Sequence, residues 1–127
     1  MTSVGPRLRH VAPQFLVADL AASLRFYERQ LGFTTDFVYD DFYASVSRDG
    51  ATLHLKCAPG SPSERSARQQ AGHLDAFVSV EDARALHLEL TRRGAPITQP
   101  LVEQAWRNLD FQVTDPDGYV LCFSQTL

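Results

Sequence analysis

The chain has 127 residues, of which 44% are hydrophobic and 21% charged, and this composition predicts one folded domain rather than a disordered segment. Its formal net charge of -3 argues against nucleic acid as a partner, because nucleic-acid binding needs a basic face. No apolar run reaches the length of a membrane span, no secretory leader opens the chain, and two cysteines make no disulfide framework. We therefore expect a cytoplasmic protein with no membrane partner.

The first half of the chain predicts a strand, a helix and then three strands. Residues 11–17 are typical of a strand, with Pro13 marking an edge or an end. Asp19 stands where a helix N-cap belongs, and Gly32 stands where a helix ends. One helical stripe lies between them: Leu20, Leu24, Tyr27 and Leu31. The strands that follow are predicted over 33–39, 42–47 and 51–57, with an Asp-Gly turn joining the last two.

The second half repeats this order. Residues 58–72 are rich in Pro, Ser, Gly, Arg and Gln, which predicts a linker. A strand is then expected over 73–80, followed by a helix that is capped by Asp82 and ends at Gly94. Residues 109–113 and 119–123 alternate as strands around the turn Asp115-Pro116-Asp117-Gly118. The fold class is therefore α+β, with two βαβββ modules over about 8–57 and 73–126 that form a cupped sheet.

One stretch of the first half combines rings and acids. Four aromatic residues and three aspartates, Asp36, Asp40 and Asp41, lie between positions 33 and 42. Rings beside carboxylates suit a flat, apolar, cationic ligand. The alternative is that Phe33 and Phe37 belong to the core and that the aspartates only solvate a hairpin.

With the repeat established, two motifs resemble the vicinal oxygen chelate superfamily. The first is the helix segment Val17-x-Asp19-Leu20-x-x-Ser23-x-x-Phe26-Tyr27-x-x-x-Leu31-Gly32-Phe33, and the second is the last hairpin, Asp115-Pro116-Asp117-Gly118. The resemblance covers nearly the whole chain and implies the fold, which many functions share.

A narrower pattern resembles the bleomycin-resistance proteins within that superfamily. It comprises Leu31-Gly32-Phe33-x-x-Asp36-Phe37-Val38-x-Asp40-Asp41-Phe42, then Leu53-His54-Leu55, then Gln104-Ala105-Trp106. The resemblance implies that Phe37, Phe42 and Trp106 line a groove between two subunits, in which a flat drug stacks. It also implies a homodimer that exchanges its first strand at Pro13. Arg107 departs from the branch, which often has glycine after the tryptophan.

The rival interpretation is a metal-dependent glyoxalase- or dioxygenase-type enzyme of the same superfamily. The positions that carry ligands in such members correspond here to Ala12, His54, Asp75 and Cys122. Alanine cannot ligate, and the other three form an unusual mixture, although each binds zinc or iron elsewhere. We therefore expect no cofactor and no metal; if a metal binds, its ligands are His54, Asp75 and Cys122.

The sequence thus favours a binding protein rather than an enzyme, in which no residue has a catalytic role. Its expected partner is a flat, partly apolar, cationic small molecule, such as a peptide or glycopeptide antibiotic. Trp106 allows two interpretations, because an indole in the polar loop 103–108 either caps the core or lines a site. The expected ligand-binding residues are Phe37, Phe42, His54, Trp106, Asp36 and Asp41.

Overall fold

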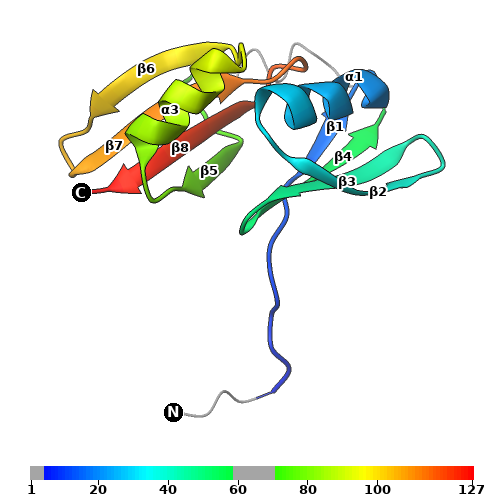
Figure 1. Ribbon diagram of the computed structural model, residues 1–127. Helices are drawn as coiled ribbons and strands as arrows, with labels where there is room; N and C mark the ends of the chain where they lie inside the picture. The colour runs from blue at the N-terminus through cyan, green and yellow to red at the C-terminus, as the bar shows by residue number, and fades with distance from the viewer. Residues whose placement is uncertain (1–4, 59–70) are drawn as a thin grey trace.

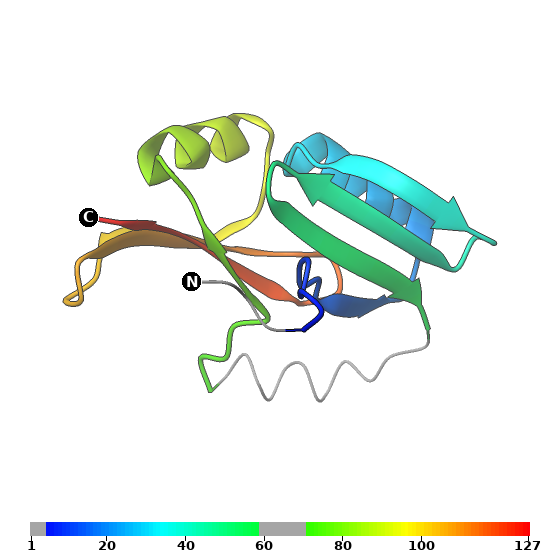
Figure 2. The same ribbon diagram turned by 90° about the horizontal axis from the view of Figure 1, so that it is seen from below.

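The structure is a computed structural model that describes residues 5–58 and 71–127. Two modules lie side by side, and each consists of a four-stranded sheet with one helical segment packed on it (Figures 1 and 2). The first module contains β1 (Gln14–Val17), α1 (Leu20–Arg25), the π-helical turn η1 (Phe26–Gln30), β2 (Thr34–Tyr39), β3 (Tyr43–Arg48) and β4 (Ala51–Cys57). The second contains β5 (Ala76–Ser79), α3 (Ala83–Arg92), β6 (Ile97–Glu103), β7 (Asn108–Thr114) and β8 (Val120–Thr126).

Both sheets have the same topology, which confirms the predicted repeat. Their strand orders are β1-β4-β3-β2 and β5-β8-β7-β6, and in each the first strand runs parallel to the last while the other pairs are antiparallel. The carboxylates of Asp19 and Asp82 cap the two helices, accepting hydrogen bonds from the N–H groups of Ala22 and Ala85. The fold class is therefore α+β, as predicted. Most of the predicted linker lies outside the described residues.

The predicted strand boundaries need correction at two places. The first strand begins at Gln14 rather than at residue 11, because Pro13 has no N–H and contributes only its carbonyl, which accepts from His54. The strand expected over 73–80 is shorter, Ala76–Ser79. One helix was expected up to Gly32, yet its last turn is a π-helix, a widening that no residue pattern signals. Among the described residues, no helix has the length and apolar character that crossing a bilayer requires.

The side chains that face the helices join into one apolar core that runs through both modules. Phe15 of β1 stacks on Tyr119, which directly precedes β8, with ring centroids 4.2 Å apart, and the Tyr119 hydroxyl accepts a hydrogen bond from the N–H of Leu16. Nearby, the Tyr27 hydroxyl donates to the buried Asp115 carboxylate at 2.7 Å. The turn between β7 and β8 is therefore fixed to the first module.

A second contact joins the modules through charged groups. Arg48, at the end of β3, pairs with Glu89 of α3 at 2.8 Å and also donates to the carbonyl of Leu31. Arg93 pairs with the same Glu89 and donates to the carbonyl of Arg29. Because both guanidinium groups reach the last carbonyls of the helical segment, they cap it while holding α3 beside it.

This packing leaves one face of each sheet turned away from its helix, which we call the open face. Alternation along the strands decides which residues lie there. Leu53 and Leu55 of β4 are buried in the core, so His54 lies on the open face of the first module. Leu121 and Phe123 are likewise core residues, which places Cys122 on the open face of the second module.

Candidate functional site

Aromatic side chains gather on the open face of the first module, where they form what we call the aromatic wall. Phe37 of β2 stacks on Tyr43 of β3, with ring centroids 6.4 Å apart, and meets the His54 ring edge-on. Phe42 continues the row between Tyr39 and Tyr43, at 5.8 and 6.3 Å. Phe37 is 48% exposed and Tyr39 is 65% exposed, so these rings are not core residues of the chain.

The structure therefore rejects the core alternative for Phe37 while supporting it for Phe33, which is 5% exposed. It also adds Tyr43, which is not among the predicted ligand-binding residues. The two-residue spacing from Tyr43 to Ser45 puts both side chains on the same face of β3. Ser45 in turn pairs with Phe37 on β2 and with His54 on β4. Residues on neighbouring strands with this spacing share a face.

A chain of hydrogen bonds crosses the aromatic wall. The Gln14 side-chain amide donates to the Tyr43 hydroxyl oxygen at 3.1 Å, and that hydroxyl lies 2.8 Å from His54 Nδ1. The three residues belong to β1, β3 and β4, so the chain spans most of the sheet. His54 and Tyr43 are both half-buried.

The charges on the aromatic wall differ from those predicted. Asp36 lies on this face, because its carboxylate accepts hydrogen bonds from the hydroxyls of Ser45 and Ser47 at 2.8 and 2.7 Å. A bulge in β2 between Thr35 and Phe37 brings it there. Lys56 lies directly across from Tyr43 on β4 and adds a positive charge that the predicted site lacks.

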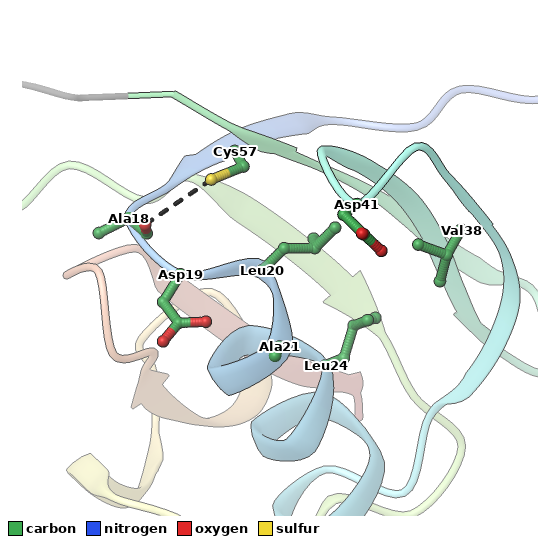
Figure 3. Close-up of a pocket in the computed structure, with 8 residues that line it drawn as sticks. All are labelled: Ala18, Asp19, Leu20, Ala21, Leu24, Val38, Asp41 and Cys57. Carbon is green, nitrogen blue, oxygen red and sulfur yellow. Dashed lines mark hydrogen bonds between the residues drawn. The ribbon is translucent and has the colours of Figure 1, made fainter.

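Asp41 does not lie on the aromatic wall, which corrects the prediction. Asp40 and Asp41 form the tip between β2 and β3, both with positive φ, a conformation that aspartate tolerates better than most residues. The tip turns Asp41 toward α1, where it lines a hollow of about 410 Å³ together with Val38, Leu20 and Cys57 (Figure 3). This hollow lies on the helix side of the sheet.

The open face of the second module carries a polar network centred on Asp110 of β7, which is 5% exposed. The side-chain amides of Gln99 and Gln104 both donate to Asp110 Oδ1, at 3.0 and 3.1 Å, and Gln112 donates to Gln99. Burial, together with Asp110, raises the pKa of the Cys122 thiol to about 11. The raised pKa makes the Cys122 thiolate, the form that attacks a substrate or ligates a metal, harder to form.

Trp106 lies at the tip of the hairpin between β6 and β7 and is 67% exposed, so it does not cap the core of this chain. The turn is closed by a hydrogen bond from the N–H of Arg107 to the carbonyl of Gln104. Arg107 has a φ of +67°, in the left-handed region that favours glycine. This conformation explains why a glycine would suit the position after the tryptophan.

One chain does not bring Trp106 to the other predicted site residues. The hairpin β6–β7 and the hairpin β2–β3 point to opposite ends of the molecule in both views (Figures 1 and 2). Phe37, Phe42, His54 and Asp36 belong to one face of the first module, and Trp106 belongs to the far end of the second. The six predicted residues thus divide into a cluster of four, a separate tryptophan, and Asp41 on the opposite face.

The alternative metal ligands do not form a site within the chain. Among the described residues, no three His, Cys, Asp or Glu side chains come close enough to hold a metal ion. The Asp75 carboxylate accepts a hydrogen bond from the N–H of Val120 at 2.8 Å, and His54 Nδ1 is engaged by Tyr43. With Ala12 lacking a donor atom and no three of these donor types gathered among the described residues, this set is a poor fit for a divalent metal.

Comparison with known families agrees with the fold and with its repeated topology. Residues 7–123 match the Glyoxalase/Bleomycin resistance protein/Dioxygenase superfamily. The chain belongs to this superfamily. No curated protein sequence matches it.

Solved structures of this superfamily share the fold along nearly the whole chain. A bleomycin-binding protein from bleomycin-producing Streptomyces verticillus, in complex with copper(II)-bleomycin, is 25% identical with a TM-score of 0.71, covering 96% of this chain and 98% of that one. Another bleomycin-binding protein, in complex with bleomycin, is 22% identical with a TM-score of 0.75, covering 94% and 100%. A glyoxalase-related enzyme from Clostridium phytofermentans is 20% identical with a TM-score of 0.76, covering 98% and 100%.

Proposed function

We propose that this protein binds and sequesters a flat, partly apolar, cationic small molecule, of the kind represented by peptide and glycopeptide antibiotics, without changing it chemically. The observation that carries the proposal is the aromatic wall, with its exposed rings beside His54 and Asp36. The two similar structures that hold bleomycin support the choice of ligand class.

Stacking supplies the affinity in this account. Exposed rings such as Phe37 and Tyr39 offer a flat apolar surface, and an aromatic pair adds about 0.5–1.5 kcal/mol beyond the area that it buries. The carboxylate of Asp36 attracts a cationic group on the ligand, while the bonds from Ser45 and Ser47 hold it in place. Sequestration then follows from mass action, because a tight binder in excess leaves little free drug.

A second copy of the chain completes the groove in this proposal. Trp106 and the aromatic wall are both exposed and lie at opposite ends of one chain, so a two-fold dimer can place each tryptophan over the partner's wall. The segment before β1 supports an exchanged strand, since Leu8 is 99% exposed and Val11 is 86% exposed. In this proposal the partner subunit covers these two apolar side chains.

Subunit mixing tests the shared groove. One variant carries Phe37→Ala and Phe42→Ala, and the other carries Trp106→Ala; each alone is expected to bind bleomycin poorly. After subunit exchange, each mixed dimer has one groove in which a wall with both phenylalanines faces an intact Trp106, and a second groove that lacks both parts. Calorimetry is therefore expected to show one tight binding site for every mixed dimer, which is one for every two chains. Light scattering confirms that each variant is a dimer. If mixing restores nothing although both variants dimerise, the two parts do not share a groove.

A thermal-shift titration with metal-free bleomycin tests binding itself. A ligand at one hundred times its dissociation constant stabilises the folded protein by about 2.7 kcal/mol, so the melting temperature is expected to rise with concentration. Phe37→Leu is expected to reduce this rise, whereas Leu88→Ala, which alters an exposed apolar residue on α3, leaves it unchanged. No rise with bleomycin or with a broad panel of peptide and glycopeptide antibiotics would refute the proposal.

A further inference from the structure

The hydrogen-bond chain on the aromatic wall suggests which nitrogen of His54 carries the ring proton. The nitrogen of the Gln14 side chain can only donate, so the Tyr43 oxygen accepts at that contact of 3.1 Å. Tyr43 has a single hydroxyl proton, and His54 Nδ1 is its other neighbour, 2.8 Å away. With the Gln14 amide as its donor, we assign the remaining contact to the Tyr43 proton, which is donated to His54 Nδ1.

This direction determines the tautomer of His54. A neutral imidazole has one N–H and one acceptor nitrogen, and the hydrogen bond made by one nitrogen decides the role of the other. Because Nδ1 accepts from Tyr43, the ring proton of His54 resides on Nε2. Phe37 and Tyr43 both meet the imidazole edge-on, at centroid distances of 6.4 and 5.5 Å, and hold its plane.

The Nε2–H group has no hydrogen-bond partner among the described residues, although His54 is half-buried. A donor that becomes fully buried without a partner loses about 1–3 kcal/mol, so any molecule that covers the aromatic wall must satisfy it or incur that loss. A ligand group that accepts a hydrogen bond in the plane of a stacked ring would satisfy it.

We infer that His54 Nε2–H is a specificity-determining donor, that Tyr43 is the positioning residue that fixes it, and that the ligand is a flat ring system with a hydrogen-bond acceptor on its edge. A ring nitrogen or a carbonyl oxygen provides such an acceptor. This inference rests on the proposed function, because it needs the aromatic wall to be the binding surface. The hydrogen bond from His54 distinguishes flat ligands that stack equally well but differ in whether the ring edge carries an acceptor.

The tautomer is measurable without any ligand. Long-range ¹H–¹⁵N correlation spectra of the labelled protein at neutral pH are expected to show His54 protonated at Nε2, with Nδ1 in its acceptor form. Tyr43→Phe keeps the ring and removes the hydroxyl, so the Nδ1 signal is expected to lose the shift that hydrogen bonding causes. Protonation at Nδ1 in the wild-type protein would overturn the inference.

Two matched fragments then test recognition. Quinoline and naphthalene have the same shape, but only quinoline has a ring nitrogen that accepts a hydrogen bond. The wild-type protein is expected to bind quinoline about three- to tenfold more tightly, which is the usual worth of one hydrogen bond. His54→Phe, which keeps a flat ring, is expected to abolish this preference without weakening naphthalene binding, and Tyr43→Phe is expected to reduce it.

The outcomes separate the two proposals. Equal binding of both fragments to the wild-type protein, or a preference that survives in His54→Phe, would overturn the role of His54 while leaving the stacking surface intact. If neither fragment perturbs the signals of Phe37 and Tyr43, the aromatic wall is not a binding surface, and the proposed function fails together with this inference.

Discussion

The Tyr27 hydroxyl donates a 2.7 Å hydrogen bond to the carboxylate of Asp115, a contact that joins the helical segment of the first module to the last turn of the second. Asp115 is 5% exposed and also accepts hydrogen bonds from the N–H groups of Asp117 and Tyr119. Despite these three donors, burial raises the pKa of Asp115 to about 6. The carboxylate that holds the modules together is thus costly to ionise.

This pKa predicts how stability changes with pH. The folded pKa of about 6 lies above the ordinary value of 3.8, so Asp115 contributes stability that is fully present below about pH 4 and lost as the pH rises through 6. The contribution is on the order of 3 kcal/mol. Urea denaturation of the wild-type protein and of Asp115→Asn at pH 4 and pH 7 isolates this effect from other carboxylates. We expect the free energy of unfolding of the wild type to fall relative to that of the variant between pH 4 and pH 7. If the difference between the two proteins is the same at both pH values, the raised pKa of Asp115 is contradicted.

Gly32 predicts a second effect at the junction between the modules. Its φ is +75°, and a Cβ there would lie 2.8 Å from Arg48 Nη1 and 3.2 Å from Arg93 Nη2, the groups that hold α3 to the first module. Gly94 has a similar φ of +80° with nothing within 4 Å, which makes it a matched control. Both alanine variants incur the backbone cost, about 1 kcal/mol. Gly32→Ala is expected to lose about 1 kcal/mol more, because it disturbs the Arg48 and Arg93 contacts. If urea denaturation shows that both variants lose the same free energy of unfolding, the Arg48 and Arg93 side chains move away from the added Cβ without cost.

Much of the fold was predictable because its signals are local. Asp19 and Asp82 precede apolar stripes of helical spacing, and the two resulting caps are the ones observed. The strand β6 was not predicted, because Pro100 lies within it and its pairing with β7 is irregular. An edge strand tolerates proline at such an irregularity, so the composition of β6 conceals it.

The candidate site was less predictable because it depends on which face of the sheet each side chain occupies and on where the hairpin tips lie. Alternation along β4 and β8 places His54 and Cys122 on the open faces, but it does not reveal that a bulge brings Asp36 there or that the hairpin tip turns Asp41 away. His87 of α3 is half-buried, with its ring 5.1 Å from that of Phe111 on β7. Such contacts join elements that are distant in sequence.

The donor set predicts the metal content of the purified protein. Ala12 has no ligand atom, and the Cys122 thiol, with a pKa raised to about 11, resists the deprotonation that a metal thiolate needs. We therefore expect elemental analysis to find far less than one zinc, iron or manganese per chain. About one metal ion per chain would favour the metal-dependent enzyme, and His54, Asp75 and Cys122 would then be the first ligands to replace.

The central claim, that this chain binds a flat drug-like molecule with Trp106 as a stacking ring, is tested most directly by calorimetric titration of bleomycin into the wild-type protein and into Trp106→Ala. We predict saturable binding that weakens by about 1–3 kcal/mol in the variant. The melting temperature of the free variant should stay unchanged, because the indole is 67% exposed in the chain. The contradictory result is no binding of bleomycin or of any antibiotic in a broad panel, together with a lower melting temperature for Trp106→Ala.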